Sequence, residues 1–296
     1  MSRSTLVTGV TGYVGGLLAP ALLDRGHQVR ALARNPAKAE VDERIQTAKG
    51  DVVSGDGLAD ALEGIEVAYY LIHAMGRGSG PVEQFAERDR DGARNFGVAA
   101  RDAGVQRIIY LGGLEANGAT SAHLKSREEV ARILAEHVSE TVHVRAAMVI
   151  GSGSASFVML KSLVERLPLM VTPKWIDTRS QPVAIADVLG TLSKLADLDE
   201  VPAEVELGGA DVLTYRDMMA RFAKVRGKRP PAIMKVPVLS PTLSSHWVGL
   251  VTPVEAGLAR PLVEGLSAEM IVKHPPPPGL NDDPKGFEEA VREALR

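Results

Sequence analysis

A cluster of glycines follows the first apolar run of the chain, within the segment TGVTGYVGG at residues 8–16. Glycine tolerates positive φ and lets another group approach the backbone closely. An amphipathic helix pattern begins inside the cluster, with apolar residues at Val14, Leu17, Leu18, Ala21 and Leu22. Because the start of a helix offers free N–H groups and a partial positive charge, the segment predicts a binding site for the phosphates of a dinucleotide.

Three of these glycines have the spacing of a strand-to-helix turn that binds a pyrophosphate. We expect Gly9 to permit the tight turn, Gly12 to let the pyrophosphate approach, and Gly15 to let helix and strand pack closely. A glycine-rich connection without a ligand is the alternative. We assign the residues between the glycines to the same site, namely Thr11, Tyr13 and Val14.

The choice between NAD and NADP depends on the end of the second predicted strand. NAD sites usually carry an acidic residue about 20 residues past the glycines, which binds the ribose 2′-hydroxyl. Arg34 takes that position here, and a cation suits the 2′-phosphate of NADP through charge-assisted hydrogen bonds. We therefore expect NADP rather than NAD as the cofactor. A solvated surface arginine is the alternative.

Further residues of the expected cofactor site follow the next three predicted strands. Asp51, in KGDVV, is placed to accept a hydrogen bond from an adenine amino group, although it fits equally as a helix cap. We assign its neighbour Val52 to the same place. Since strand ends line the crevice of an open α/β sheet, we also assign Leu71, His73 and Gly112 to the site. For His73, an ordinary histidine at the edge of the core is the alternative.

Apolar segments and helical patterns alternate along the first half of the chain. Strands are expected at residues 4–10, 27–34, 44–51, 67–75, 106–114 and 142–150. Helices are expected at 14–25, 81–104 and 121–137. This alternation implies right-handed crossovers, and so predicts an α/β fold with a doubly wound parallel Rossmann sheet.

The pattern loosens after residue 150. We expect a helix at 158–167, an irregular stretch at 169–183, a helix from about Ala186, a strand at 204–209 and a helix at 214–225. We divide the chain into an NAD(P)-binding Rossmann domain, a smaller C-terminal substrate lobe that covers the strand ends, and a proline spacer with a C-terminal helix. Their ranges are 1–150, 151–275 and 276–296.

Four segments in this order resemble the atypical short-chain dehydrogenases, in particular their NmrA-like and NAD(P)H-binding branch. They are TGVTGYVGG, GDVV, RIIYLGGL and VRAAMVIGSGSASF. The resemblance covers about residues 4–225 and is much less specific for activity than for fold and cofactor. It implies a parallel seven-stranded Rossmann sheet, a dinucleotide over the first five strands, and a C-terminal lobe for a small-molecule substrate.

One departure from the family pattern concerns the catalytic residues. Active relatives place Tyr and Lys at i and i+4 on the helix after the fifth strand, with a Ser at the end of that strand. Here His123 takes the Tyr place and Arg127 takes the Lys place. Gly112 and Gly113 end the strand, so the Ser is missing.

The His123 and Arg127 pair changes the chemistry expected of the site. Neutral imidazole is a poor acid, and a neighbouring arginine lowers its pKa, so His123 has to be protonated before it can donate. It serves alternatively as a base or a hydrogen-bond donor, with Arg127 binding ribose hydroxyls or a substrate carboxylate. An ordinary polar helix face is the remaining alternative, because Lys125 and Glu128 lie nearby.

Three functions stay open from the sequence. The first is an NADP(H)-dependent oxidoreductase that acts on a small carbonyl or enone-type substrate. The second is a non-catalytic NAD(P)-binding sensor or regulator, and the third is an epimerase or isomerase. Arg145 is expected to form structural ion pairs. Trp175, Arg179 and Gln181 are weaker candidates for pocket residues. The seven histidines show no metal-ligand spacing, so no metal is expected.

Composition excludes several other classes. A net charge of −3 without any basic run disfavours nucleic-acid binding, and the absence of cysteine excludes disulfides and thiolate zinc sites. The chain enters a strand at once, which predicts a cytoplasmic protein. Residues 236–254 carry no charged side chain, but three prolines argue against a membrane span. We expect a buried or lid-like segment there, with a homodimer contact or a membrane-surface contact as alternatives.

Overall fold

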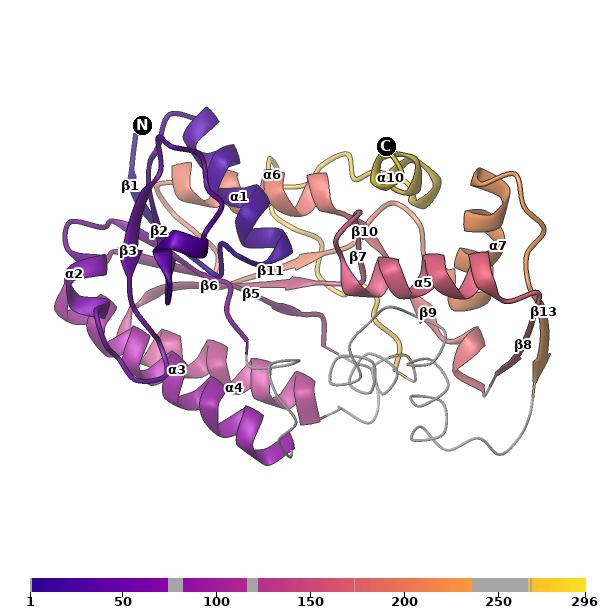
Figure 1. Ribbon diagram of the computed structural model, residues 1–296, viewed down its shortest axis with the longest axis horizontal. Coiled ribbons are helices and arrows are strands. Elements are labelled where there is room, and N and C mark those ends of the chain that lie inside the picture. The colour runs from indigo at the N-terminus through magenta and orange to yellow at the C-terminus, as the bar shows by residue number, and fades with distance from the viewer. Residues whose placement is uncertain (1, 74–81, 116–121, 173, 236–265, 267) are drawn as a thin grey trace.

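The computed structural model describes residues 2–73, 82–115, 122–172, 174–235, 266 and 268–296. Its centre is a seven-stranded parallel sheet in the order β11-β6-β5-β4-β1-β2-β3 (Figure 1). The strands are β1 (Ser4–Thr8), β2 (Gln28–Ala33), β3 (Gln46–Lys49), β4 (Val67–Tyr70), β5 (Arg107–Gly113), β6 (Glu140–Ala146) and β11 (Glu204–Leu207). The predicted doubly wound parallel sheet is therefore confirmed.

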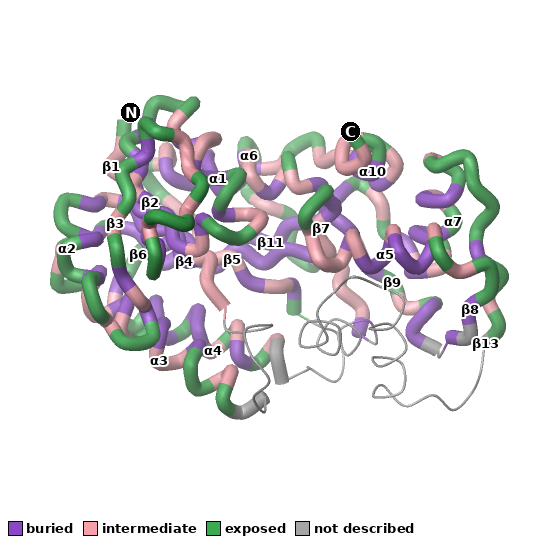
Figure 2. The backbone as a smooth tube through the Cα atoms, viewed as in Figure 1, coloured by how far each residue is buried: buried purple, intermediate pink, exposed green. Residues whose placement is uncertain are grey.

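Helices cover both faces of this sheet, because successive side chains of a strand point to opposite faces. Val7 of β1 packs in the core beneath α1 and α6, whereas the adjacent Leu6 packs in the core against α2, α3 and α4. Figure 2 shows the buried strands between these layers. The helices are α1 (Tyr13–Asp24), α2 (Leu58–Leu62), α3 (Val82–Asp102), α4 (Ala122–His137) and α6 (Ile185–Asp197), and the short turn η1 (Pro36–Lys38) follows β2.

Helix α1 is rotated relative to the face predicted from its sequence. Leu17 was expected in the buried stripe but is 38% exposed. The buried positions are instead Gly15, Leu18, Ala19 and Leu22. A Cβ at position 15 would lie 2.4 Å from the carbonyl oxygen of Gly9. The close contact of Gly15 with the glycine turn thus sets the rotation of α1, and Leu17 points away.

The second lobe lies to the right of the sheet in Figure 1 and has its own apolar core. The rings of Phe157 and Phe222 meet edge to face at its centre, 5.9 Å apart. Part of the stretch 169–183, expected to be irregular, is strand, because it pairs with a distant segment. The elements are β7 (Val149–Ile150) with β10 (Val183–Ala184), β8 (Leu169–Thr172) with β13 (Ala232–Lys235), β9 (Arg179–Ser180) with β12 (Leu213–Thr214), and α5 (Ala155–Arg166), η2 (Lys174–Asp177) and α7 (Tyr215–Val225).

The chain crosses between the two lobes more than once. Helix α6 and strand β11 both belong to the range 151–275, yet α6 packs on α1 and β11 extends the main sheet beside β6. The division at residue 150 therefore stays a proposal about cofactor-side and substrate-side regions, since the core of the sheet draws on both ranges.

The C-terminal segment docks across both lobes and ends in helix α10 (Phe287–Ala294). Phe287, Ala290 and Val291 are buried, as the sequence pattern predicts. The carboxylate of Asp211 accepts a hydrogen bond from the backbone N–H of Phe287 at 2.8 Å, and so fixes the start of the helix. Among the described residues, no helix is both long and apolar enough to cross a membrane. The apolar segment 236–254 lies outside the described residues.

Candidate functional site

The turn between β1 and α1 requires its glycines. Gly9 has a φ of +69°, and its carbonyl oxygen accepts a hydrogen bond from the N–H of Gly12 at 2.8 Å. A Cβ at Gly9 would lie 2.9 Å from the carbonyl oxygen of Leu71. With Gly15 held against Gly9 as well, the backbones of β1, β4 and α1 approach one another at this point.

The first turn of α1 opens toward a pocket. The N–H groups of a first helical turn have no partner within the helix, and no side chain caps them here. Gly12, the residue before the helix, lines the pocket without a Cβ that would fill it. Backbone donors and the helix dipole are therefore available to an anion. This cradle fits the pyrophosphate of a dinucleotide.

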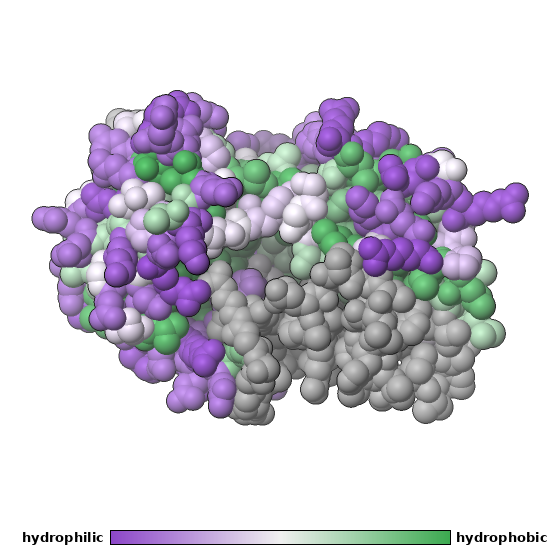
Figure 3. Space-filling view, viewed as in Figure 1, coloured by the Kyte–Doolittle hydropathy of each residue, from purple (hydrophilic) through white to green (hydrophobic). Residues whose placement is uncertain are grey.

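A single pocket of about 430 Å³ extends from this turn into the second lobe. In Figure 3, hydrophobic side chains border the hollow between the two halves of the visible face. Many of the residues assigned to the site from the sequence line this one pocket, namely Gly9, Gly12, Tyr13, Val14, Gly15, Leu71, His73, Gly112 and Arg127. The structure thus brings together residues that lie more than a hundred positions apart in the sequence.

Other assigned residues lie outside the described lining of the pocket. Arg34 is exposed at the end of β2, and it has no hydrogen bond or ion pair with any described residue. Asp51 accepts a hydrogen bond from the N–H of Val53 at 2.9 Å, which orders the turn after β3. Val52 is buried and Thr11 is exposed. His123 lies in α4, but its side chain is outside the described residues.

Arg127 reaches the pocket from α4, whereas Lys125 on the same helix is exposed. The guanidinium of Arg127 donates to the carbonyl oxygen of Leu111 at 3.1 Å, beside the end of β5. Burial raises the pKa of the nearby Tyr110 hydroxyl to about 12, although the charge of Arg127 opposes that rise. Tyr110 is therefore a neutral structural group at physiological pH.

A buried histidine fills the space beneath the end of β5. A Cβ at Gly112 would lie 2.3 Å from Nε2 of His143, so a serine does not fit there while the imidazole keeps this position. The imidazole lies 5.1 Å from the Tyr110 ring, between ring centroids. Burial, together with the charges of Arg145 and Arg127, lowers the pKa of His143 to about 3. The absence of a side chain at position 112 and the presence of this neutral histidine are thus linked by packing.

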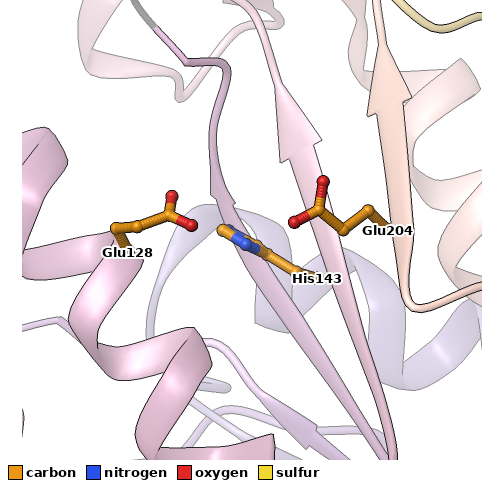
Figure 4. A group of neighbouring side chains, drawn as sticks. All are labelled: Glu128, His143 and Glu204. Carbon is orange, nitrogen blue, oxygen red and sulfur yellow. The ribbon is translucent and has the colours of Figure 1, made fainter.

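His143 also belongs to a group of three potential metal ligands, with Glu128 on α4 and Glu204 on β11 (Figure 4). Their ligand atoms lie within 4.8 Å of one another. However, Arg145 donates to both carboxylates, at 2.6 and 2.7 Å to Glu128 and 2.8 Å to Glu204. Both carboxylates are already paired with this one guanidinium, as expected for structural ion pairs of Arg145. We therefore interpret the group as an ion-pair network.

Tyr13 joins the glycine turn to the second lobe. A Cβ at Gly151 would lie 2.2 Å from the Tyr13 hydroxyl, and a Cβ at Gly153 would lie 2.4 Å from its ring. Tyr13 was predicted to belong to the site, but its contact with the second lobe was not predicted. The two glycines before α5 were the available signal, because a glycine often marks a close approach.

Side chains of the second lobe form the rest of the pocket, and the sequence analysis missed most of them. We call the following residues the second-lobe wall: Met159, Leu160, Leu163, Met219, Leu266 and Met270. Trp175 lines the pocket as predicted, and Tyr215 stands beside it. Arg179 and Gln181 are not among the described lining residues; Arg179 pairs with Glu269, and Gln181 bonds to backbone groups.

The comparisons with known proteins agree with this geometry. A family model described as NAD(P)H-binding matches residues 9–151. The chain is 36% identical over 112 residues to a 3-beta-hydroxysteroid dehydrogenase of Mycolicibacterium neoaurum, a match that covers 36% of this chain and 30% of that protein. The chain thus spans less than a third of this relative's length. It is 26% identical over 266 residues to a ceramide reductase of Caulobacter vibrioides, which covers 86% of this chain and 81% of that protein.

A solved structure of similar fold is the Citrobacter sp. triphenylmethane reductase complexed with NADP(H). It aligns with a TM-score of 0.76 over 99% of this chain and 100% of that chain, at 20% sequence identity. This likeness concerns the fold, and membership of the NmrA-like branch stays a prediction. The glycine turn, the parallel sheet and the family match agree: residues 9–151 form an NAD(P)H-binding domain.

Proposed function

We propose that this protein is an NADP(H)-dependent oxidoreductase that acts on a small carbonyl or enone-type substrate. The observation that supports this most is the continuous pocket, which joins the glycine turn to a second lobe with room for another molecule. A protein that only binds a dinucleotide has no need of that additional space. Two relatives are named as a dehydrogenase and a reductase, which agrees with redox chemistry.

The glycine turn and the first turn of α1 would hold the pyrophosphate of the cofactor. Arg34 would pair with the 2′-phosphate, because an exposed arginine is available at the end of β2. When bound, NADPH supplies a hydride to the carbonyl carbon, and the carbonyl oxygen takes up one proton, so that an alcohol and NADP⁺ are formed. His73 and Arg127 line the pocket beyond the glycine turn and would border the reacting groups.

We assign the proton transfer to His123, one helical turn before Arg127 in α4. An imidazole donor produces a pH limb near a pKa of about 6.5, whereas a tyrosine donor gives a limb near 10. His123→Phe should remove the limb and most of the turnover while NADPH binding persists. Unchanged turnover in this variant would move the proton donor to His73 or the second lobe.

The experiment that tests the function is NADPH oxidation by the purified protein with a panel of aldehydes, ketones, quinones and enones. We expect saturable oxidation with at least one compound and formation of the corresponding reduced product. Binding of NADPH without turnover on the whole panel would instead favour the second candidate.

The second candidate is a non-catalytic NAD(P) sensor. It is favoured by the end of β5, where the family serine is replaced by Gly112 and His143 fills the space that a side chain would need. In a sensor, His123→Phe leaves cofactor affinity unchanged and there is no turnover to lose. Turnover by the unsubstituted protein therefore separates the two candidates, and His123→Phe then tests the proton donor.

A further inference from the structure

The second-lobe half of the pocket presents mainly apolar and thioether side chains, together with Ser154 and Ser156. The second-lobe wall contains three methionines and three leucines, and it is completed by two aromatic rings. Trp175 and Tyr215 stand edge to face with their ring centroids 6.0 Å apart. Burial of apolar surface against such a wall stabilises a bound apolar molecule.

The charged side chains of the second lobe lie outside the described lining of the pocket, and four of its arginines pair with carboxylates. These pairs are Arg179 with Glu269, Arg216 with Asp177, Arg221 with Asp211, and Arg226 with Glu165. Each arginine of these pairs is between 36% and 56% exposed at its side chain, so the pairs lie near the surface. These four arginines are therefore paired near the surface and do not line the pocket.

The one arginine in the described lining of the pocket belongs to the first domain. Arg127 enters from α4, and its guanidinium is held at the carbonyl oxygen of Leu111 beside β5. A carboxylate, sulfate or phosphate seated among the residues of the second-lobe wall would lose its water without gaining a cation. Burial of an unpaired ion is strongly unfavourable, whereas an uncharged hydrocarbon body carries no such penalty.

We propose that the second-lobe half of the pocket binds the body of a neutral, largely apolar carbonyl compound and rejects an anionic one. This inference rests on the proposed function, and it names the substrate class of the same pocket. The reacting carbonyl gains a hydride and a proton, as in the proposed reaction, and the body of the substrate is unchanged. Because methionine side chains are flexible and polarizable, the wall accommodates more than one ring system.

The test compares matched pairs of ketones that differ by one carboxylate. Suitable pairs of increasing size are acetophenone with acetylbenzoate, acetylnaphthalene with acetylnaphthoate, and benzophenone with benzoylbenzoate. Binding is measured by titration calorimetry on the full-length protein, with and without NADP⁺, so that the result does not depend on turnover. We expect at least one neutral ketone to bind at least about tenfold more tightly than its carboxylate, which corresponds to about 1.4 kcal/mol.

Two charge-introducing variants locate the binding site. Met219→Lys places a cation in the wall and should weaken binding of the neutral ketone by at least about tenfold. The same variant should reduce or reverse the difference in affinity between the neutral ketone and its carboxylate. Met219→Leu is the matched control, and it should keep the preference for the neutral ketone. Met270→Lys with Met270→Leu repeats the test at a partly exposed position, in case Met219→Lys does not fold. Quenching of Trp175 emission in a Trp247→Phe background places the ligand beside the wall.

Each outcome bears on the proposal separately from the proposed function. Equal or tighter binding of the carboxylates, or no neutral ketone binding more tightly than about 1 mM, would overturn the substrate class. Neutral binding that both lysine variants leave unchanged would also overturn it, because the ligand would then sit elsewhere. Neutral ketones that bind at the wall without any NADPH oxidation would sustain the binding inference but defeat the oxidoreductase. Turnover with a preference for anionic ketones would support the oxidoreductase but overturn the proposed substrate class.

Discussion

The two halves of the pocket are built in different ways. The cofactor half is built around backbone groups of the turn at residues 8–16 and of the ends of adjacent strands, and side chains such as Leu71, His73 and Arg127 border it. The surface of the second-lobe half is formed by side chains from α5, η2, α7 and residues near 266–270. A backbone cradle depends on glycines that no other residue replaces, whereas apolar side chains of similar volume substitute for one another. We therefore expect substitutions to abolish function in the cofactor half and to be tolerated in the second-lobe half when they keep apolar character and volume.

The largest effect is expected at Gly12. Gly12→Val places a branched side chain directly before the first turn of α1, where the pyrophosphate would bind. It should therefore weaken dinucleotide binding by more than about hundredfold. The matched control is Gly190→Val on α6, since a Cβ there meets nothing within 4 Å. Calorimetric titration with NADPH measures the loss, and a thermal melt checks the fold. If a folded Gly12→Val protein bound NADPH normally, the glycine turn would not be the cofactor cradle.

The next largest effect concerns cofactor choice. Arg34→Ala should cost NADP(H) binding about 1.5–3 kcal/mol, because a charged hydrogen-bond pair is lost, while NAD(H) binding changes little. Arg101→Ala, at an exposed arginine on α3, is the control. Titrations of both cofactors against both variants measure the preference. A wild-type protein without preference, or an Arg34→Ala protein that still prefers NADP(H), would remove Arg34 from the site.

A smaller effect is expected from the histidine beneath the cofactor half. The unfolded chain protonates His143 near an ordinary pKa of about 6.5, but the folded protein does so only near 3. The unfolded state thus binds more protons between these values, so the free energy of unfolding falls as the pH drops below about 6.5, by up to about 1.4 kcal/mol per pH unit. Burial also lowers the pKa of His27, so protonation of this histidine in the unfolded state further lowers the free energy of unfolding as the pH falls.

His143→Phe tests this dependence by removing the proton site. Between about pH 7.5 and pH 5.5 the variant should lose about 1 kcal/mol less stability than the wild type, as measured by urea unfolding at each pH. The exposed His274→Asn serves as the control. Identical pH slopes for the wild type and His143→Phe would show that the imidazole titrates normally in the fold.

The smallest effect is expected in the second-lobe wall. Met159→Leu keeps the apolar character and nearly the volume of a buried residue, so it should change stability by less than about 1.5 kcal/mol and leave NADPH affinity intact. Differential scanning calorimetry and NADPH titration check both. A loss of NADPH binding in this variant would show that the two halves are not independent, and the contrast drawn between them would fail.

The same contrast explains what could be predicted from the sequence. Gly9, Gly12 and Gly15 were predictable because the turn that they form is local and its geometry dictates the residue type. The sheet was predictable because the strands alternate with helices. Leu17 was placed wrongly because the rotation of α1 is set by the contact of Gly15 with Gly9, which periodicity does not contain.

The side chains of the second-lobe half could not be predicted in the same way. Met159 and Met219 belong to separate helices, and nothing in either helix indicates that both border one pocket. The contact of Gly112 with His143 joins two strands across the sheet, and the buried imidazole looks like any other histidine in the sequence. Such residues depend on tertiary packing, so their roles emerge only from the structure.

The central claim is that the pocket brings a carbonyl compound beside a reduced nicotinamide so that a hydride passes between them. The most direct measurement uses NADPH that carries deuterium on one or the other face of nicotinamide C4, with the neutral ketones as substrates and mass spectrometry of the product. The account predicts that one labelled form, and not the other, delivers a single deuterium to the carbinol carbon. If both the ketone and NADPH bind but neither form transfers deuterium, the protein is not the oxidoreductase proposed here.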